Sequence, residues 1–271
     1  MRFPAVAGQF YEGDADALRR QVEGCYRHRL GPGSVPKVAV KGPREIRGLV
    51  CPHAGLVYSG PVAAHAYAAL AADGFPDTVV ILGPNHTGSG APEALATVDW
   101  QTPLGVAKRD EALCKRLRRD LVEEDNLAHR KEHSLEVQLP FLLQLNPSLK
   151  FAAICMGFQE YEPAAAVGKI VAEAIADRDA LVLASTDFSH YVAKEEATRQ
   201  DRLAIDQILK MDPWGFYRAK TTHAISMCGY GPVIAMLTAM GQGKATLLKY
   251  ATSGDAAPMR DVVGYAAMAV K

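Results

Sequence analysis

Short apolar runs of strand type alternate along the chain with longer segments of helical periodicity. The runs predict strands at 46–51, 78–82, 149–155, 180–185, 246–251 and 262–270. The segments between them predict helices at 14–27, 60–74, 109–122, 133–145, 162–177, 194–210 and 229–240. Such alternation is typical of a parallel sheet with helices on both faces. We therefore expect an α/β fold, a single three-layer α/β/α domain over residues 1–271 with a mixed, largely parallel central sheet.

Proline and glycine mark several boundaries of these elements. Pro61 is expected at the first position of its helix, and Gly74 is expected to close that helix. The Gly- and Pro-rich stretch 30–44 predicts a loop that leads into the first central strand. The last two strands are joined by Ser253-Gly254-Asp255 and are expected to form a hairpin, which makes the sheet mixed.

The composition is that of an ordinary globular protein and narrows the classes of partner. Lys+Arg and Asp+Glu both total 30, so the balance of charge gives no case for a nucleic-acid or anionic-membrane partner. No apolar run approaches the ~20 residues of a membrane span, and the N-terminus lacks the apolar core of a secretory signal. The five scattered cysteines form no Cys-x-x-Cys pair. They are typical of reduced thiols in a cytoplasmic protein.

Three of the apolar runs end, within a few residues, on a histidine: His53, His86 and His190. In an open α/β sheet, ligands bind beyond the carboxyl ends of the strands. Imidazole is the commonest metal ligand and the usual proton shuttle near neutral pH. The first hypothesis is therefore metal chemistry at this edge of the sheet. The alternative is that each histidine only hydrogen-bonds its own loop.

Asp187 and Cys228 are the other candidates for chemistry. Asp187 lies three residues before His190, a spacing that puts both side chains on one face of a helical turn. There the carboxylate would orient the imidazole beside a metal or in a general base, unless Asp187 only caps the turn and His190 lies on the surface. Cys228 precedes an apolar helix, whose backbone N–H groups and dipole would lower the thiol pKa. It is the best of the five cysteines for a ligand or a redox-active group.

Two further segments resemble known motifs, a zinc-peptidase motif and a phosphate-binding loop, but lack features that those motifs need. Residues 129–133 spell the His-x-x-Glu-His of a zinc peptidase, but the polar segment 123–132 argues against the buried helix that this motif needs. His133 and Glu136 would share a helical face and could turn toward the same crevice. The glycine-rich segment 83–90 lacks the spacing and the lysine of a phosphate-binding loop. The histidines without a strand-end context are interpreted as structural: His28, His65, His129 and His223.

Five motifs, in order along the chain, resemble those of the Memo family, called AmmeMemoRadiSam system protein B in prokaryotes. They are Pro-His-Ala-Gly at 52–55, Gly-Pro-Asn-His at 83–86, Glu-His-Ser-Leu-Glu-Val-Gln-Leu-Pro at 132–140, Ser-Thr-Asp-Phe-Ser-His at 185–190 and Met-Cys-Gly-Tyr-Gly-Pro at 227–232. The segment 4–11 also looks like the opening of that family. The resemblance implies a fold similar to that of class III extradiol dioxygenases.

The resemblance also implies a set of site residues. His53, His86 and Cys228 would hold a metal, with Cys228 where the ring-cleaving enzymes have a carboxylate. Asp187 and His190 would line the same pocket as catalytic residues, with His190 as acid and base. Fe(II) is the expected metal, with Cu or Zn as alternatives because a soft thiolate favours them. A thiolate ligand can itself be oxidised, which disfavours ring cleavage.

Three functions compete on this basis. The leading hypothesis is a metal-binding protein with a redox or O₂-linked role. The second is a genuine extradiol-type dioxygenase that acts on an aromatic substrate, and the third is a non-enzymatic protein whose vestigial pocket binds a peptide or a partner. A small molecule or a peptide is the expected pocket ligand. The family name further implies association with AMMECR-like and radical-SAM proteins. Whether the protein is an enzyme stays open at this stage.

Overall fold

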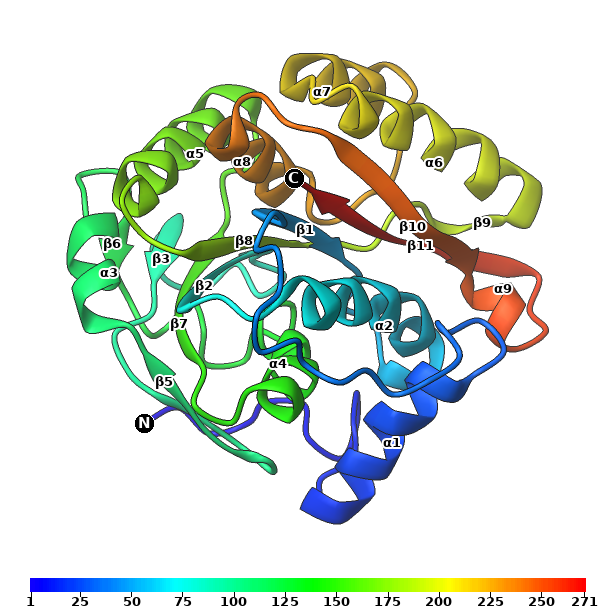
Figure 1. The fold of residues 1–271 in the computed structure, drawn as a ribbon. Coiled ribbons are helices and arrows are strands. Elements are labelled where there is room, and N and C mark those ends of the chain that lie inside the picture. The colour runs from blue at the N-terminus through cyan, green and yellow to red at the C-terminus, as the bar shows by residue number, and fades with distance from the viewer.

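A computed structural model describes residues 1–271 and places eleven strands in one sheet (Figure 1). The strand order is β10-β11-β1-β8-β2-β7-β3-β6, while β5 pairs with β7 and β4, and β9 pairs with β11. The strands are β1 (Gly48–Cys51), β2 (Thr78–Pro84), β3 (Glu93–Leu95), β4 (Trp100–Thr102), β5 (Gly105–Arg109), β6 (Glu123–Glu124), β7 (Lys150–Met156), β8 (Ala180–Ser185), β9 (His190–Ala193), β10 (Ala245–Thr252) and β11 (Asp261–Val270).

The middle of the sheet is parallel and one flank is antiparallel. Strands β1, β8, β2 and β7 are paired in parallel, so that their carboxyl ends share one edge. Strand β11 is antiparallel to both β1 and β10. The expected mixed, largely parallel sheet is confirmed. The shared carboxyl edge is the place where segments that follow β1, β2 and β8 can meet.

Helices cover both faces of the sheet, which confirms the three-layer architecture (Figure 1). Helices α1, α2 and α4 pack on one face, and α3, α5, α6, α7 and α8 pack on the other. The helices are α1 (Ala15–Arg27), α2 (Leu56–Asp73), α3 (Glu111–Leu117), α4 (Leu139–Leu145), α5 (Tyr161–Ile175), α6 (Lys194–Leu209), α7 (Pro213–Thr222), α8 (Tyr230–Met240) and α9 (Ser253–Ala256), with a 3₁₀ turn η1 (Glu136–Gln138) before α4. None of them combines the length and apolar character that crossing a membrane would need.

The central strands read as unbroken apolar runs because both of their faces are buried. In β1, Leu49 and Cys51 enter the core under α2 and α4, whereas Val50 enters the core on the opposite side. The two cores contain 39 and 36 buried residues, so each face of the sheet needs its own helical layer.

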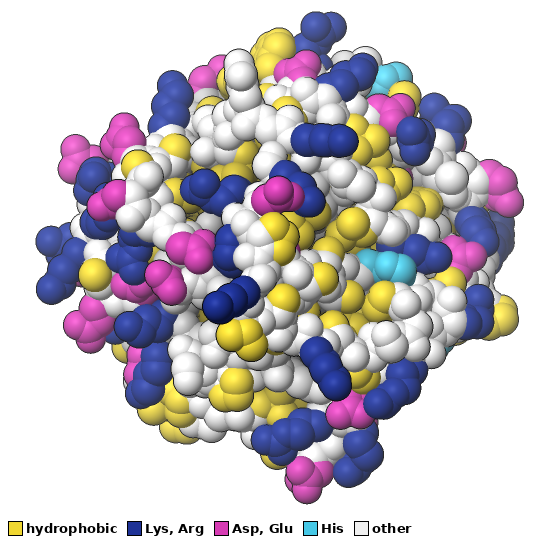
Figure 2. Space-filling model, viewed as in Figure 1, with side chains coloured by type: hydrophobic (Ala, Val, Ile, Leu, Met, Phe, Trp, Pro, Cys, Tyr) yellow, Lys and Arg dark blue, Asp and Glu magenta, His cyan; other side chains and the backbone are white.

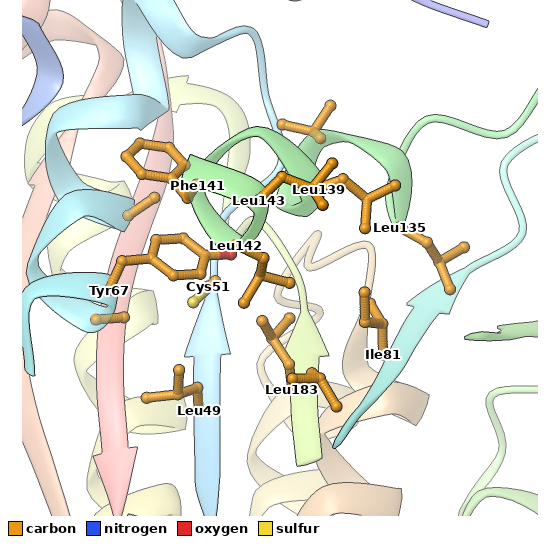
Figure 3. Packing of buried hydrophobic residues seen from close by; sticks show 14 of the residues in the cluster. Leu49, Cys51, Tyr67, Ile81, Leu135, Leu139, Phe141, Leu142, Leu143 and Leu183 are labelled. Atoms are coloured by element: carbon orange, nitrogen blue, oxygen red, sulfur yellow. The ribbon is translucent and has the colours of Figure 1, made fainter. Parts of the chain in front are cut away.

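The core under α4 also holds Gln138 in place, at the carboxyl edge of the parallel strands. Figure 3 shows the apolar side chains of the α4 segment packed over those of β1, β8 and β2. The ring of Tyr67, on α2, stacks on Phe141 with centroids 4.7 Å apart and an interplanar angle of 6°. Its hydroxyl donates to Gln138 Oε1, which anchors the Gln138 amide to the core.

Helix α2 begins earlier than the sequence predicts. Its first residue is Leu56, and Pro61 lies inside the helix, although Gly74 closes it as expected. The extra turn is stabilised from outside, because Phe10 O accepts the Leu56 N–H at 2.8 Å. A contact from the N-terminal segment therefore decides where this helix starts.

The expected helix at 133–145 is divided. Residues 133–135 precede η1, and α4 follows with Pro140 near its start. The Glu132 carboxylate accepts the backbone N–H groups of His133 and Ser134, which holds these residues in a turn.

The expected helix at 109–122 is shorter in the structure, where it spans Glu111–Leu117. The apolar pattern also did not predict several short or half-exposed elements: β3, β4, β5, β6, β9 and α7.

The surface carries both signs of charge. Figure 2 shows Lys and Arg interspersed with Asp and Glu on the visible face, with apolar atoms between them. This agrees with the balanced totals of the sequence.

Strand β3 contains a buried carboxyl group that should make stability depend on pH. Glu93 is fully buried, its Oε1 accepts only the Phe158 N–H, and its Oε2 has no hydrogen-bond partner. Burial raises the pKa of Glu93 to about 8, against the lowering effect of the Phe158 hydrogen bond. The folded protein therefore retains a proton that the unfolded chain loses above its ordinary pKa. The stability of the wild type should fall as the pH rises from about 4.5 to about 8.

Glu93→Gln is expected to remove this dependence. At pH 8 the variant should be more stable than the wild type by about 4 kcal/mol, which is the pKa shift of Glu93 converted at about 1.4 kcal/mol per pH unit. Near pH 4.5 the two proteins should differ little. Urea unfolding at both pH values measures the difference, with Glu123→Gln on the exposed strand β6 as the control. Equal pH dependence of Glu93→Gln and the wild type would contradict the prediction.

Candidate metal centre

The side chains of His53, His86 and Cys228 meet at the carboxyl edge of the parallel strands. One donor atom from each lies within 4.8 Å of the other two. Cys228 Sγ is 3.2 Å from His53 Nε2, and the rings of His53 and His86 have centroids 5.2 Å apart with an interplanar angle of 82°. His53 is buried, whereas the His86 side chain is 33% exposed. The group is therefore open to solvent on the side of His86.

A buried hydrogen-bond network determines which nitrogen of His53 carries the proton. Pro52 O can only accept, so the Gln138 amide nitrogen must face it, at 3.1 Å, and the same nitrogen donates to Ser185 Oγ at 2.7 Å. The one hydroxyl proton of Ser185 goes to Ser134 O, 2.6 Å away. Ser185 Oγ must therefore accept from His53 Nδ1, at 2.8 Å. The lone pair of His53 is consequently on Nε2, the nitrogen that faces the candidate centre.

Glu132 gives His86 the matching tautomer. Its buried carboxylate accepts the backbone N–H of His86 at 2.6 Å and His86 Nδ1 at 2.9 Å. Burial by itself would raise the pKa of Glu132, but the hydrogen bond and charge of His86 and the Ser134 N–H lower it to about 2. Because the carboxylate is ionised, Nδ1 must donate, and in the neutral imidazole the lone pair is then on Nε2. A histidine that donates one N–H to a carboxylate is typical of metal ligands. Glu132 lies in the 132–140 motif, but no pattern in the sequence pairs it with His86.

The expectation that His133 and Glu136 share one crevice is half wrong. The His133 ring stacks on His86 with centroids 4.5 Å apart, and burial lowers its pKa to about 4 against the opposing charge of Glu132. Glu136 instead points away and accepts the Val6 N–H and the Tyr11 hydroxyl. The two residues diverge because 133–135 form a turn and not a regular helix.

The expected lowering of the Cys228 pKa is not seen. Burial raises the pKa of the thiol, and the charge of Asp187 raises it further. Cys228 precedes Gly229, the N-cap of α8, so that its sulfur lies outside the first helical turn. The Asp187 backbone N–H donates to the sulfur at 3.3 Å, which lowers the pKa too little to offset burial.

Asp187 contacts His53, and His190 lies near enough for its charge to act on both Asp187 and His53, but Asp187 and His190 do not share a helical turn. Residues 186–189 are irregular, and His190 is the first residue of β9. Asp187 Oδ1 accepts the His53 backbone N–H at 2.8 Å, and its Oδ2 is 4.0 Å from His53 Nε2. Burial raises the pKa of Asp187 to about 6.

Two carbonyl groups determine the tautomer of His190. Its Nδ1 is 2.7 Å from Phe188 O and 2.8 Å from Ser226 O. Because both oxygens can only accept, Nδ1 carries a proton, and in the neutral ring the lone pair is on Nε2. The Ser226 hydroxyl also accepts the His190 backbone N–H at 2.7 Å. The ring is thereby held in the orientation of a base that uses Nε2.

Comparison with known proteins gives similarity over nearly the whole chain. The family model described as Memo-like protein matches residues 2–269. A MEMO1 family protein of Methanothermobacter thermautotrophicus is 47% identical over 275 residues, covering 98% of this chain and 99% of the relative. A MEMO1 family protein of Methanocaldococcus jannaschii is also 47% identical, covering 100% and 99%. An uncharacterized Escherichia coli K12 structure has a TM-score of 0.55 at 14% identity, covers 82% of this chain and 99% of its own, and shares the fold alone.

Proposed function

Because the chain belongs to the Memo family, we propose that it binds one iron or copper ion through His53 Nε2, His86 Nε2 and Cys228 Sγ and serves a redox or O₂-linked reaction. The observation that carries the proposal is the pair of hydrogen-bond networks described above. Each network places the proton of a neutral imidazole on Nδ1 and leaves Nε2 as the nitrogen available to an ion, and one donor atom from each of the three residues lies within 4.8 Å of the other two.

The donor set suits such an ion. Two neutral imidazoles with one thiolate fit iron, copper or zinc better than magnesium or calcium, which prefer oxygen ligands. The Cys228 thiol would lose its proton on binding the ion, since a coordinated thiol is deprotonated. The thiolate and the ionised Glu132 would then balance a charge of 2+. An iron or copper ion held here would supply electron transfer or O₂ chemistry.

The neighbouring residues have separate roles in this proposal. His190 Nε2 would accept a proton from the bound ligand or return one to it. Asp187 would hold the His53 backbone and receive a hydrogen bond from a ligand beside His53. The thiolate takes the place of a hard carboxylate and can itself be oxidised, which favours a redox role over cleavage of an aromatic ring.

The test is a metal titration of protein purified without oxygen. The protein is expected to retain about one Fe(II) or Cu(I) per chain after desalting. X-ray absorption spectroscopy of the bound metal should then report two imidazole nitrogens and one thiolate sulfur as its protein ligands. A protein that retains no ion would overturn the proposal. Retention of zinc, with iron and copper both rejected, would overturn its redox part.

A further inference from the structure

The side chain of Gln159 makes two hydrogen bonds to the backbone around Cys228. Gln159 lies in the loop between β7 and α5. Its Nε2 donates to Cys228 O at 2.9 Å, and its Oε1 accepts the Gly231 N–H at 2.9 Å. One amide group thus joins two points of the segment 228–231, which carries the candidate thiolate into α8.

The loop that carries Gln159 is itself held in place. The Gly157 N–H donates to Pro92 O at 2.6 Å, and the Phe158 N–H donates to Glu93 Oε1 at 3.2 Å. A Cβ atom at Gly231 would lie 2.9 Å from Gln159, so the amide and the helix start are in close contact. Gln159 therefore presents its amide to Cys228 from a fixed base.

The opposite side of the Cys228 segment is held by the β8 end. The Gly229 N–H donates to Thr186 Oγ1 at 3.0 Å, and a Cβ atom at Gly229 would lie 2.4 Å from Ser185 O. The segment is thus fixed between Gln159 and the 185–186 backbone. Because the Cys228 backbone is held on both sides, the position of its Cα atom is fixed.

Helix capping alone does not explain Gln159. A cap of α8 needs only the acceptor Oε1, which takes a free N–H of the first turn. The donor Nε2 bonds a carbonyl before the helix, and this carbonyl belongs to the candidate ligand.

We propose that Gln159 is a positioning residue for Cys228: its two hydrogen bonds hold the peptide so that Sγ points at His53 Nε2. The inference rests on the proposed metal-binding function for its consequence, but the geometry concerns residues of this chain only. Fixing the Cys228 carbonyl stops rotation of its peptide plane. The direction of the Cα–Cβ bond then sets the 3.2 Å approach of the sulfur to His53.

Two substitutions separate positioning from capping. Gln159→Glu keeps an acceptor for the Gly231 N–H but loses the donor to Cys228 O, whereas Gln159→Leu loses both. Both variants are expected to bind Cu(I) about 10-fold more weakly, the size of effect seen for groups that orient ligands. Both should also change the thiolate-to-metal absorption of the Co(II)-substituted protein. If Gln159→Glu binds like the wild type and only Gln159→Leu is weakened, Gln159 is a cap and the inference is wrong.

A metal-free measurement keeps this inference distinct from the proposed function. Cys228 is the one cysteine of intermediate exposure, and the other four are buried. Because Gln159→Leu frees the Cys228 peptide, iodoacetamide at alkaline pH should alkylate Cys228 several-fold faster in this variant than in the wild type. Gln242→Leu, in the exposed turn after α8, should match the wild type, and thermal unfolding checks that each variant is folded. If the wild type binds no metal but the alkylation rates differ as expected, the proposed function fails and the positioning role stands. If the wild type binds metal and Gln159→Leu changes neither readout, the positioning role is wrong.

Discussion

Cys228→Ser and His53→Ala are each expected to weaken the binding of iron or copper by at least about 100-fold, more than the loss of a group that only orients a ligand. A serine hydroxyl does not ionise near neutral pH, so the first variant loses the only anionic donor among the three. The second loses the imidazole whose Nε2 is 3.2 Å from the sulfur. Competition with a chelator of known affinity measures both effects.

The number of protons released on metal binding identifies the thiol. The Cys228 thiol must lose its proton to bind the ion, so the wild type should release about one proton per ion more than Cys228→Ser does under the same conditions. Cys114→Ser, on the distant helix α3, should behave as the wild type. Metal content and proton release that are unchanged in Cys228→Ser would show that the thiolate is not a ligand.

Glu136→Ala is expected to lower the free energy of unfolding by about 3–5 kcal/mol. The carboxylate is fully buried and pairs with Arg2 Nη1 at 2.6 Å. It also accepts the Ala5 N–H at 2.8 Å and the Tyr11 hydroxyl at 2.5 Å. Its removal leaves the buried Arg2 charge without its counter-ion and leaves the Ala5 N–H and the Tyr11 hydroxyl without their acceptor. Equilibrium unfolding in urea measures the loss.

Two further variants check this explanation. Arg2→Met should also be strongly destabilising, because it leaves the buried Glu136 carboxylate without its cation. Glu173→Ala removes an exposed glutamate from α5 and should change stability by less than about 0.5 kcal/mol. A loss below about 1 kcal/mol in Glu136→Ala would mean that the ion pair contributes little beyond the cost of its own burial.

The central strands and most helices could be predicted because their apolar patterns are long and regular. The strand at 180–185 agrees with β8 at both ends, and the expected helix at 14–27 is α1 with Asp14 as its N-cap. The start of α2 could not be predicted, because its extra turn depends on the carbonyl of Phe10, far away in sequence. The short strands at the sheet margins carry too few apolar residues for a pattern and are stabilised by their neighbours.

The sequence predicts the candidate ligands of the site but not the hydrogen bonds that orient them. Parallel strands with a common carboxyl edge bring His53 and His86 together, and resemblance to the Memo family pointed to Cys228. Glu132 was not recognised as a partner of His86, because the two residues are 46 positions apart. The assumption of a regular helix at 133–145 also led to the wrong direction for Glu136.

The sequence by itself determined the sheet, its two helical layers and the strand ends at which candidate ligands occur. Its periodicity and its motifs are local, so they report which elements form and which residues follow them. Only the tertiary structure decided which nitrogen of each histidine bears the proton. That choice depends on Ser185 and Glu132, which lie far from their histidine partners in the chain. The tertiary structure also decided that the pKa of the Cys228 thiol is raised, because this pKa follows from burial and from the charge of Asp187 and not from position in the sequence.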